Sequence, residues 1–242
     1  MSRTYKRALI VGCSHGAHIC PEARKAIIQF KNEYKPHRVI HLGDFCDTAA
    51  FRGGANGTSD MSEPVEPDVD DGLTFLAEIG ATDVLMGNHE DRLFRLQYSP
   101  NAVIAYAAHQ VIECIRKHCV KYKSPMLPWD GVFQSMILGN YKLLHGVMYG
   151  ENAIRDHAET YGNVIHAHTH RPGVATGRRD DHPVGMCVGT LTNRRSMEYA
   201  KARRATLSWG MGFVWGEYND QLFHPNLCLG PQEAGSPKWR LP

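Results

Sequence analysis

Five short polar motifs stand in this sequence at points where an apolar run ends. They are Cys13-Ser14-His15, Gly43-Asp44-Phe45-Cys46-Asp47, Gly87-Asn88-His89-Glu90, His145-Gly146 and His168-Thr169-His170. Their imidazole, carboxylate, amide and thiol groups can all ligate metal ions. The recurring glycines allow the backbone to turn sharply and to approach a ligand closely. Together the motifs indicate a site that binds metal ions.

The motifs differ in how often each would be expected to occur by chance. The chain has 14 histidines in 242 residues, so a His-x-His pair is expected ~0.8 times at random and means little alone. The tetrapeptide at residues 87–90 is expected on the order of 0.003 times in a chain of this composition. Turn and capping chemistry is the alternative role for Asp44, Asn88 and His89 taken singly. The ordered set of five favours a metal site.

The hydrophobic pattern predicts the elements that must carry these motifs. In the first half, strands are expected at residues 7–12, 38–42 and 83–86, and helices at 21–33, 71–79 and 101–120. The stretch 52–71 is rich in Gly, Pro, Ser and acidic residues and is expected to be a loop.

The second half is richer in strands. They are expected at 131–138, 141–145, 164–168, 184–188 and 212–218, with one helix near 151–161. This order predicts an α/β fold of two packed sheets flanked by helices. Because loops at strand ends gather distant residues at one rim of a sheet, the five motifs are expected to converge there.

The bulk composition is typical of a globular protein, with 43% hydrophobic and 21% charged residues. The formal net charge of +2 is too small to identify a nucleic-acid partner. No apolar run approaches the ~18–20 residues of a membrane span, and no membrane partner is expected. The run from Ala8 to Val11 is too short for a signal peptide. Scattered cysteines indicate free thiols and a cytoplasmic location. We expect one domain over residues 1–242, with an extended or peripheral tail from about 219 to 242.

The ordered motifs resemble those of the calcineurin-like metallophosphoesterase superfamily, which run D-x-H, G-D-x-x-D, G-N-H-D/E, H and G-H-x-H. The resemblance covers roughly residues 8–172. It implies a four-layer α/β/β/α sandwich of two mixed sheets, in agreement with the order of elements above. The stretch from Trp209 to Phe213 also resembles that of small phosphoesterases found in phage genomes.

The resemblance also implies two divalent metal ions and a role for each motif residue. The first ion would be held by Cys13, His15, Asp44 and His170, and the second by Asp44, Asn88, His145 and His168. His89 would serve the leaving oxygen as general acid or transition-state donor, and Asp47 would orient His89. Two cations ~3.5–4 Å apart clamp the attacking and leaving oxygens and make a bridging hydroxide accessible at neutral pH. We therefore expect hydrolysis of a phosphate ester.

Two positions depart from the family pattern. Cys13 stands where the family has Asp, and a thiolate favours zinc or iron over the harder manganese or magnesium. Cys13 would also make the site vulnerable to oxidation. Its alternative role is that of a small buried hydrophobe that binds no metal. Ala167 replaces the Gly of the last motif, and little effect is expected.

Residues outside the five motifs are expected to have structural or supporting roles, or to contact the substrate. His166 alternates with the last motif and is expected to be a core or supporting histidine, and His18, His41 and His109 are expected to be structural. The basic segment 194–204 is either a contact surface for phosphates, with Trp209 stacking on a base, or a solvated helix face. That segment contains Arg194, Arg195, Lys201, Arg203 and Arg204. The Gly-rich loop with Phe51 and Arg52 could reach the substrate.

The residues that follow the second motif narrow the expected class of substrate. Protein phosphatases of the superfamily continue the second motif with Arg-Gly, whereas Asp47 is followed here by Thr48 and Ala49. This favours a phosphodiesterase or nuclease, with zinc, iron or manganese as cofactor and nucleic acid or a nucleotide as partner. The alternatives are a phosphomonoesterase or protein phosphatase, and a nucleotide or nucleic-acid binder that Cys13 has disabled as an enzyme. The oligomeric state stays open.

Overall fold

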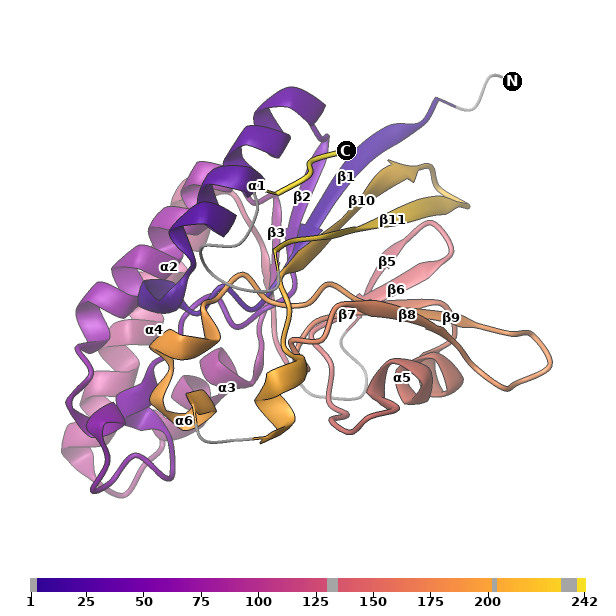
Figure 1. The fold of residues 1–242 in the computed structure, drawn as a ribbon. Helices are drawn as coiled ribbons and strands as arrows, with labels where there is room; N and C mark the ends of the chain where they lie inside the picture. The colour runs from indigo at the N-terminus through magenta and orange to yellow at the C-terminus, as the bar shows by residue number, and fades with distance from the viewer. Residues whose placement is uncertain (1–3, 130–134, 202–203, 232–238) are drawn as a thin grey trace.

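The computed structural model of the chain describes residues 4–129, 135–201, 204–231 and 239–242. Within these residues two mixed β-sheets lie face to face, and helices cover their outer faces (Figure 1). The C-terminal residues lie on the side of the molecule formed by the larger sheet (Figure 1).

The larger sheet combines the first part of the chain with the last. Its strands are β1 (Lys6–Val11), β2 (Arg38–His41), β3 (Asp83–Leu85), β4 (Met126–Leu127), β10 (Gly212–Tyr218) and β11 (Phe223–Leu229). They lie in the order β11-β10-β1-β2-β3-β4. Strands β1 to β4 are parallel, whereas β10 is antiparallel to both of its neighbours. The carboxyl ends of β1, β2 and β3 therefore meet at one rim.

The smaller sheet is formed by the middle of the chain. Its strands are β5 (Met136–Leu138), β6 (Tyr141–Leu144), β7 (Val164–His166), β8 (Gly173–Thr176) and β9 (Val184–Cys187), in the order β5-β6-β7-β9-β8. Strands β6, β7 and β9 are parallel, and β5 and β8 are antiparallel edge strands. The carboxyl ends of β6 and β7 form the second rim from which motif residues follow.

The helices are α1 (Pro21–Tyr34), α2 (Val65–Ile79), α3 (Asn88–Leu96), α4 (Ala102–Tyr122), α5 (Ala153–Tyr161) and α6 (Glu198–Lys201). Short 3₁₀ helices are η1 (Gly16–His18), η2 (Ala49–Phe51), η3 (Ser59–Ser62), η4 (Arg194–Ser196) and η5 (Arg204–Ser208). Helix α1 begins with Pro21, whose missing N–H is not needed in the first turn. Among the described residues, no helix combines the length and apolar character that crossing a membrane requires.

The apolar side chains of β1 explain why the sheets and helices form four layers. Alternate residues of a strand face opposite sides of the sheet. Leu9 and Val11 accordingly pack with α1, α2 and α4, whereas Ala8 and Ile10 pack against the smaller sheet. Helix α5 covers the other face of the smaller sheet through Ala158. The four-layer α/β/β/α sandwich expected from the sequence is confirmed.

Several element boundaries differ from the expected ones. Helix α2 begins at Val65, so the expectation of a loop through residue 71 was wrong. Acidic residues and proline are compatible with a first helical turn, where Glu66 and Asp68 favour the helix dipole and Pro67 needs no N–H. Helix α3 and strands β4, β8 and β11 were not expected. Residues 130–134 of the strand expected at 131–138 lie outside the described residues, and 136–138 form β5.

Candidate metal centre

The motif residues converge where the rims of the two sheets face each other. Cys13 and His15 follow β1, Asp44 and Asp47 follow β2, and Asn88 and His89 begin α3 directly after β3. On the opposite side, His145 follows β6, and His168 and His170 follow β7. All nine predicted site residues are thus brought to one place by parallel strands of two sheets.

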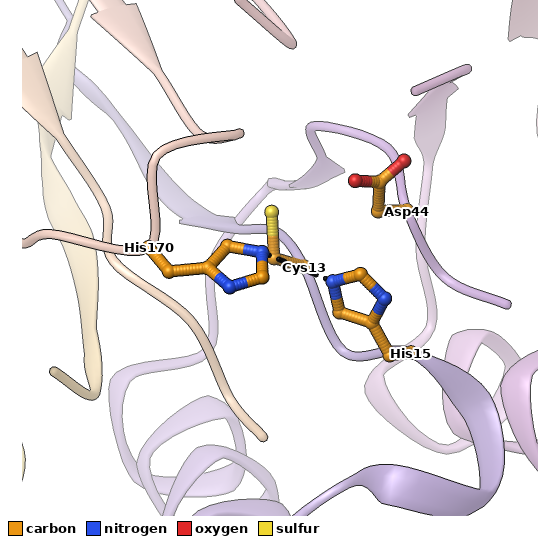
Figure 2. A group of neighbouring side chains, drawn as sticks. All are labelled: Cys13, His15, Asp44 and His170. Atoms are coloured by element: carbon orange, nitrogen blue, oxygen red, sulfur yellow. Dashed lines mark hydrogen bonds between the residues drawn. The ribbon is translucent and has the colours of Figure 1, made fainter. Parts of the chain in front are cut away.

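One half of this centre consists of Cys13, His15, Asp44 and His170, all of which are buried. Figure 2 shows the four side chains converging, and each offers a ligand atom within 4.8 Å of the others. The Nε2 atoms of His15 and His170 lie 3.0 Å apart. This half therefore presents one sulfur, two ring nitrogens and a carboxylate to a common point. We call it the sulfur half.

The other half shares Asp44 and adds an amide instead of a thiol. Ligand atoms of Asp44, His145 and His168 lie within 4.8 Å of one another. Asn88 Oδ1 is 3.2 Å from His145 Nε2 and 2.9 Å from His168 Nδ1. Asp44 Oδ2 is 3.1 Å from His145 Nε2. We call this group of oxygen and nitrogen donors the amide half.

The hydrogen bonds of the amide half are compatible with a bound cation. His145 Nδ1–H donates to the Leu42 carbonyl over 2.8 Å, so the Nε2 of a neutral ring carries a lone pair. That lone pair would face oxygens of Asp44 and Asn88, which are acceptors as well. Burial lowers the pKa of His145, but the charge of Asp44 outweighs burial and raises it, so a proton or a metal ion between these atoms is favoured. Acceptors that point at one another are stabilised by a cation between them. The residues present therefore fit a bound divalent ion.

The sulfur half repeats this pattern. His15 Nδ1–H donates to Asp47 Oδ1 over 2.9 Å, and His15 Nε2 faces His170. Burial lowers the pKa of His15, but Asp47 outweighs burial and raises it, so a positive charge is favoured here as well. His170 Nδ1 is buried and has no hydrogen-bond partner among the described residues. An imidazole held in one tautomer by a carboxylate is the usual arrangement of a metal-ligating histidine. This half also fits a bound ion.

The pKa values of the centre follow from burial and from the histidine–carboxylate contacts. Burial opposes ionisation of Asp44, but His145 and His89 outweigh it and hold the pKa of Asp44 well below its usual range. Burial lowers the pKa of His168 to about 3, and His145 adds to this effect. His168 is therefore neutral, the form that ligates metal. Burial, followed by the charge of Asp44, raises the pKa of the Cys13 thiol, so only a nearby cation would make it a thiolate.

Five of the predicted ligands adopt a left-handed backbone conformation that non-glycine residues rarely take. Their φ angles are 52° for Cys13, 51° for His15, 55° for Asp44, 64° for His168 and 57° for His170. Each such residue costs about 1–3 kcal/mol and persists only where surrounding contacts impose it. Such strain is concentrated at functional sites, and here it aims the ligand side chains at one another.

Backbone hydrogen bonds impose this conformation on the loops after β1 and β2. The N–H of Cys13 donates to the carbonyl of Gly43, and that of His15 to the carbonyl of Asp44, both over 2.9 Å. Gly43 has a φ of 97°, and a Cβ there would collide with the backbone nitrogen of Gly87. The glycines of the second and third motifs therefore allow two loops to pass in contact.

Two buried acids support the loops and were not expected from the sequence. The Glu90 carboxylate accepts the backbone N–H groups of Asp44, Cys46 and Gly87 over 2.8, 3.0 and 2.8 Å. Burial and the charge of Asp44 raise the pKa of Glu90 to about 7. Its place as the last residue of the third motif was the only available signal. Asp68 accepts N–H groups of Asp47 and Thr48 from α2, with no motif to mark it.

His89 and Asp47 lie together at the edge of the centre. His89 Nδ1–H donates to the Asp47 carbonyl over 2.6 Å, and the same nitrogen is 3.2 Å from Asp47 Oδ1. His89 Nε2 is 4.0 Å from Asp44 Oδ2 and so faces the centre. Burial lowers the pKa of His89 even though Asp44 and Asp47 oppose this. The geometry allows Asp47 to orient His89.

The remaining histidines are held by other contacts. His166 is buried, donates from Nδ1 to the Ala167 carbonyl and stacks on His157 at 4.0 Å between ring centroids. His41 Nε2 lies 3.0 Å from Ser14 Oγ, and its Nδ1 accepts the N–H of Gly43. His109 lies exposed on α4. These three positions are consistent with structural roles.

In the described part of the basic segment 194–204, η4 and α6 follow each other and Arg204 begins η5, while residues 202–203, including Arg203, lie outside the described residues. Arg195 and Arg204 are exposed. Trp209 packs its ring 4.1 Å from that of His170 and so lies beside the sulfur half. Arg52 forms an ion pair with the buried Asp60 and stacks over Tyr199 at 5.4 Å. Phe51 packs against the core under the helices.

Comparison with known proteins agrees with this geometry. The family model described as calcineurin-like phosphoesterase matches residues 6–182. The chain is 28% identical to the Gene 54 protein of Mycobacterium phage D29 over 217 residues. This match covers 78% of this chain and 80% of that protein. It is 26% identical over 231 residues to the Gene 54 protein of Mycobacterium phage L5, covering 84% and 85%. A solved structure described as a novel archaeal phosphodiesterase is 15% identical with a TM-score of 0.43, covering 91% of this chain and 99% of that one.

Proposed function

Since the chain belongs to the calcineurin-like phosphoesterase family, we propose that it is a two-metal phosphodiesterase acting on nucleic acid or on small nucleotide diesters. One observation carries the two-metal part of this proposal. Asp44 belongs to two groups of ligand atoms, one with Cys13, His15 and His170 and the other with His145 and His168. The continuation of Asp47 by Thr48 and Ala49, in place of Arg-Gly, supports the diester preference.

Seven side chains would hold the two ions. The sulfur half would use Cys13, His15 and His170, the amide half Asn88, His145 and His168, and Asp44 would bridge them. When bound, two such ions lower the pKa of a water and stabilise charge on phosphate oxygens. The thiol, imidazole and carboxylate set suits zinc or iron, and the second set also suits manganese.

His89 would serve the leaving oxygen. Its Nδ1–H is engaged by the Asp47 carbonyl, so Nε2 is the atom available to the substrate. When Nε2 is protonated, the carboxylate of Asp47 at 3.2 Å from Nδ1 stabilises the resulting imidazolium. His89 would then hold a proton ready for the alkoxide that departs from phosphorus. Asp47 acts through His89 and is a positioning residue.

A second candidate function follows from Cys13. Relatives of the family carry a permanent carboxylate there, whereas burial raises the pKa of this thiol and keeps it neutral until a cation arrives. A sulfur half that stays empty would leave a nucleotide or nucleic-acid binder with one ion and little turnover. Metal content and turnover must therefore be measured on the same sample.

The test is elemental analysis of the full chain reconstituted with zinc, iron or manganese, together with assays of bis-p-nitrophenyl phosphate and p-nitrophenyl phosphate. We expect at least two ions per chain and faster hydrolysis of the diester. His109→Gln, an exposed change on α4, is the matched control. Faster hydrolysis of the monoester would overturn the diester preference. A single ion with no hydrolysis of either compound would overturn the enzyme and favour the binder.

A further inference from the structure

A second group of ligand-type side chains lies beside the centre and takes no part in the two-metal arrangement. It consists of His18 from η1, Glu63 directly after η3, and the second carboxylate oxygen of Asp47. Each offers one ligand atom, and the three atoms lie within 4.8 Å of one another. His18 Nε2 is 3.1 Å from Glu63 Oε2 and 3.9 Å from Asp47 Oδ2.

The Asp47 carboxylate shows that this group is incomplete as it stands. Its Oδ1 contacts His15 at 2.9 Å and His89 at 3.2 Å. Its Oδ2 is buried and has no hydrogen-bond partner among the described residues, although the side chain is only 1% exposed. A buried carboxylate oxygen without a donor is strongly unfavourable unless a positive charge compensates it.

Within the described ranges, no neighbouring Lys or Arg supplies that charge to Oδ2. Arg92 reaches the same loop, but its Nη1 lies 3.4 Å from the backbone carbonyls of Asp47 and Thr48 instead of the carboxylate. In the described part of the chain, no Lys or Arg forms an ion pair with Asp47. The free oxygen instead points toward His18 Nε2, a potential ligand atom.

We propose that His18 Nε2, Asp47 Oδ2 and Glu63 Oε2 bind a third divalent cation, separate from the two ions of the centre. One imidazole and two carboxylates are a ligand set for zinc, manganese or iron. The two negative charges balance a dication. The side chains of His18 and Glu63 are 12% and 30% exposed, so the ion reaches this site from solvent without passing through the centre.

The third site meets the catalytic group at one carboxylate. Asp47 would bind the cation through Oδ2 while its Oδ1 holds His15 and His89. Occupancy of the third site therefore fixes the orientation of Asp47, and through it the ring of His89. This inference goes beyond the proposed function and does not depend on it, because it concerns an additional ion.

Equilibrium dialysis of the folded full-length chain against stepped concentrations of free zinc or manganese tests the proposal. We expect the wild type to bind one ion more per chain than His18→Gln or Glu63→Gln at saturation. Both substitutions are close in size to the native residue, and circular dichroism checks that each variant is folded. Glu113→Gln, which removes an acid from the surface of α4, is the matched control and should leave the number of ions unchanged.

Anomalous diffraction from crystals soaked in manganese or zinc gives a second, direct readout. A peak between His18, Asp47 and Glu63 is expected in the wild type and should be missing in Glu63→Gln. Equal ion counts in the wild type and in both variants would overturn the third site, as would occupied metal positions in the centre with no peak beside His18. Failure of the two-metal function would instead appear as a lower count in the wild type, with the difference of one ion retained.

Discussion

The two halves of the metal centre share Asp44 but surround it with different chemistry. The sulfur half adds a thiol and two imidazoles that are all buried, whereas the amide half adds the buried His145 and the partly exposed Asn88 and His168. In the amide half, burial lowers the pKa of His145, but Asp44 outweighs burial and raises it, so an entering cation displaces a proton from an imidazole. In the sulfur half, burial raises the pKa of the Cys13 thiol well above its ordinary value, so an entering cation must displace a proton that is held more tightly. The amide half therefore accepts a cation more readily than the sulfur half.

This difference shows that the chemical type of a ligand and its protonation state before the cation binds are separate properties. The left-handed backbone of Cys13 and of His168 places both side chains toward the centre at similar conformational cost. What separates the halves is the charge that each side chain carries before the ion arrives. Substitutions that change this charge, and leave the backbone as it is, are the sharpest probes of the comparison.

Asp44→Asn should have the largest effect, because it removes the charge that both halves share. Loss of residues that merely orient a metal ligand already costs 10–100-fold in metal affinity or activity. We expect this change at the bridging ligand to lower zinc affinity more than ~100-fold and to abolish diester hydrolysis. Titration calorimetry and the diester assay measure both. Asp91→Asn, which breaks a surface pair with Arg95, serves as control. Loss of one ion with the other still tightly bound would show that Asp44 belongs to a single half.

His89→Ala should leave both halves loaded and remove turnover. In the proposed mechanism the ring serves proton transfer and takes no part in the two sets of ligand atoms, so kcat should fall ~10²–10⁴-fold. Elemental analysis of the variant should match that of the wild type. An unchanged kcat would assign proton transfer to another group. Loss of an ion would instead make His89 a metal ligand, and another residue would have to be the proton donor.

The motifs predicted the composition of the centre because each stands at the end of a recognisable strand. Asp44 and Asn88 could be placed on one rim because β2 and β3 are short apolar runs that end in glycine. The supports of the centre could not be predicted in this way. Glu90 meets Cys46 only because two loops pass in contact, and their separation in sequence carries no periodic signal.

Backbone conformation was also beyond the sequence analysis. Cys13 and His15 adopt positive φ although neither residue type favours it, because hydrogen bonds to the loop after β2 override local preference. The early start of α2 has a similar origin, since Asp68 bonds the loop of Asp47 from the first turn. Tertiary contacts decided the positive φ values, whereas in α2 they stabilise a first turn that its acidic residues and proline also allow.

Cys13→Asp should change which metal works and should leave the fold intact. A carboxylate is charged without help from a cation and prefers harder ions, so the sulfur half should become as ready to bind as the amide half. We expect activity with manganese to hold or rise relative to zinc, and sensitivity to peroxide to fall. Cobalt substitution supplies a control, since the sulfur-to-cobalt charge-transfer absorption of the wild type should vanish in the variant. An unchanged ranking of zinc, iron and manganese, with no such absorption in the wild type, would show that Cys13 is not a ligand.

Thr190→Val should have the smallest effect and should act on the sulfur half alone. The buried Thr190 hydroxyl donates to the Cys13 carbonyl over 2.8 Å, and its oxygen accepts the N–H and the hydroxyl of Thr192. Valine keeps the shape and removes all three bonds, but the Cys13 carbonyl retains the N–H of Leu191. We therefore expect a loss of about 1–3 kcal/mol in the free energy of unfolding, measured in urea without metal.

The matched control for this substitution is Thr160→Val, which removes an exposed hydroxyl bond on α5 and should change stability very little. Because Thr190 positions the backbone of Cys13 and touches no residue of the amide half, Thr190→Val should weaken the cobalt–sulfur absorption at limiting cobalt. Manganese, which suits oxygen and nitrogen donors, should still bind the amide half with its original affinity. If manganese binding fell in parallel with the cobalt–sulfur absorption, the two halves would be coupled through the loop after β1. The metal affinity of each half would then depend on the whole centre.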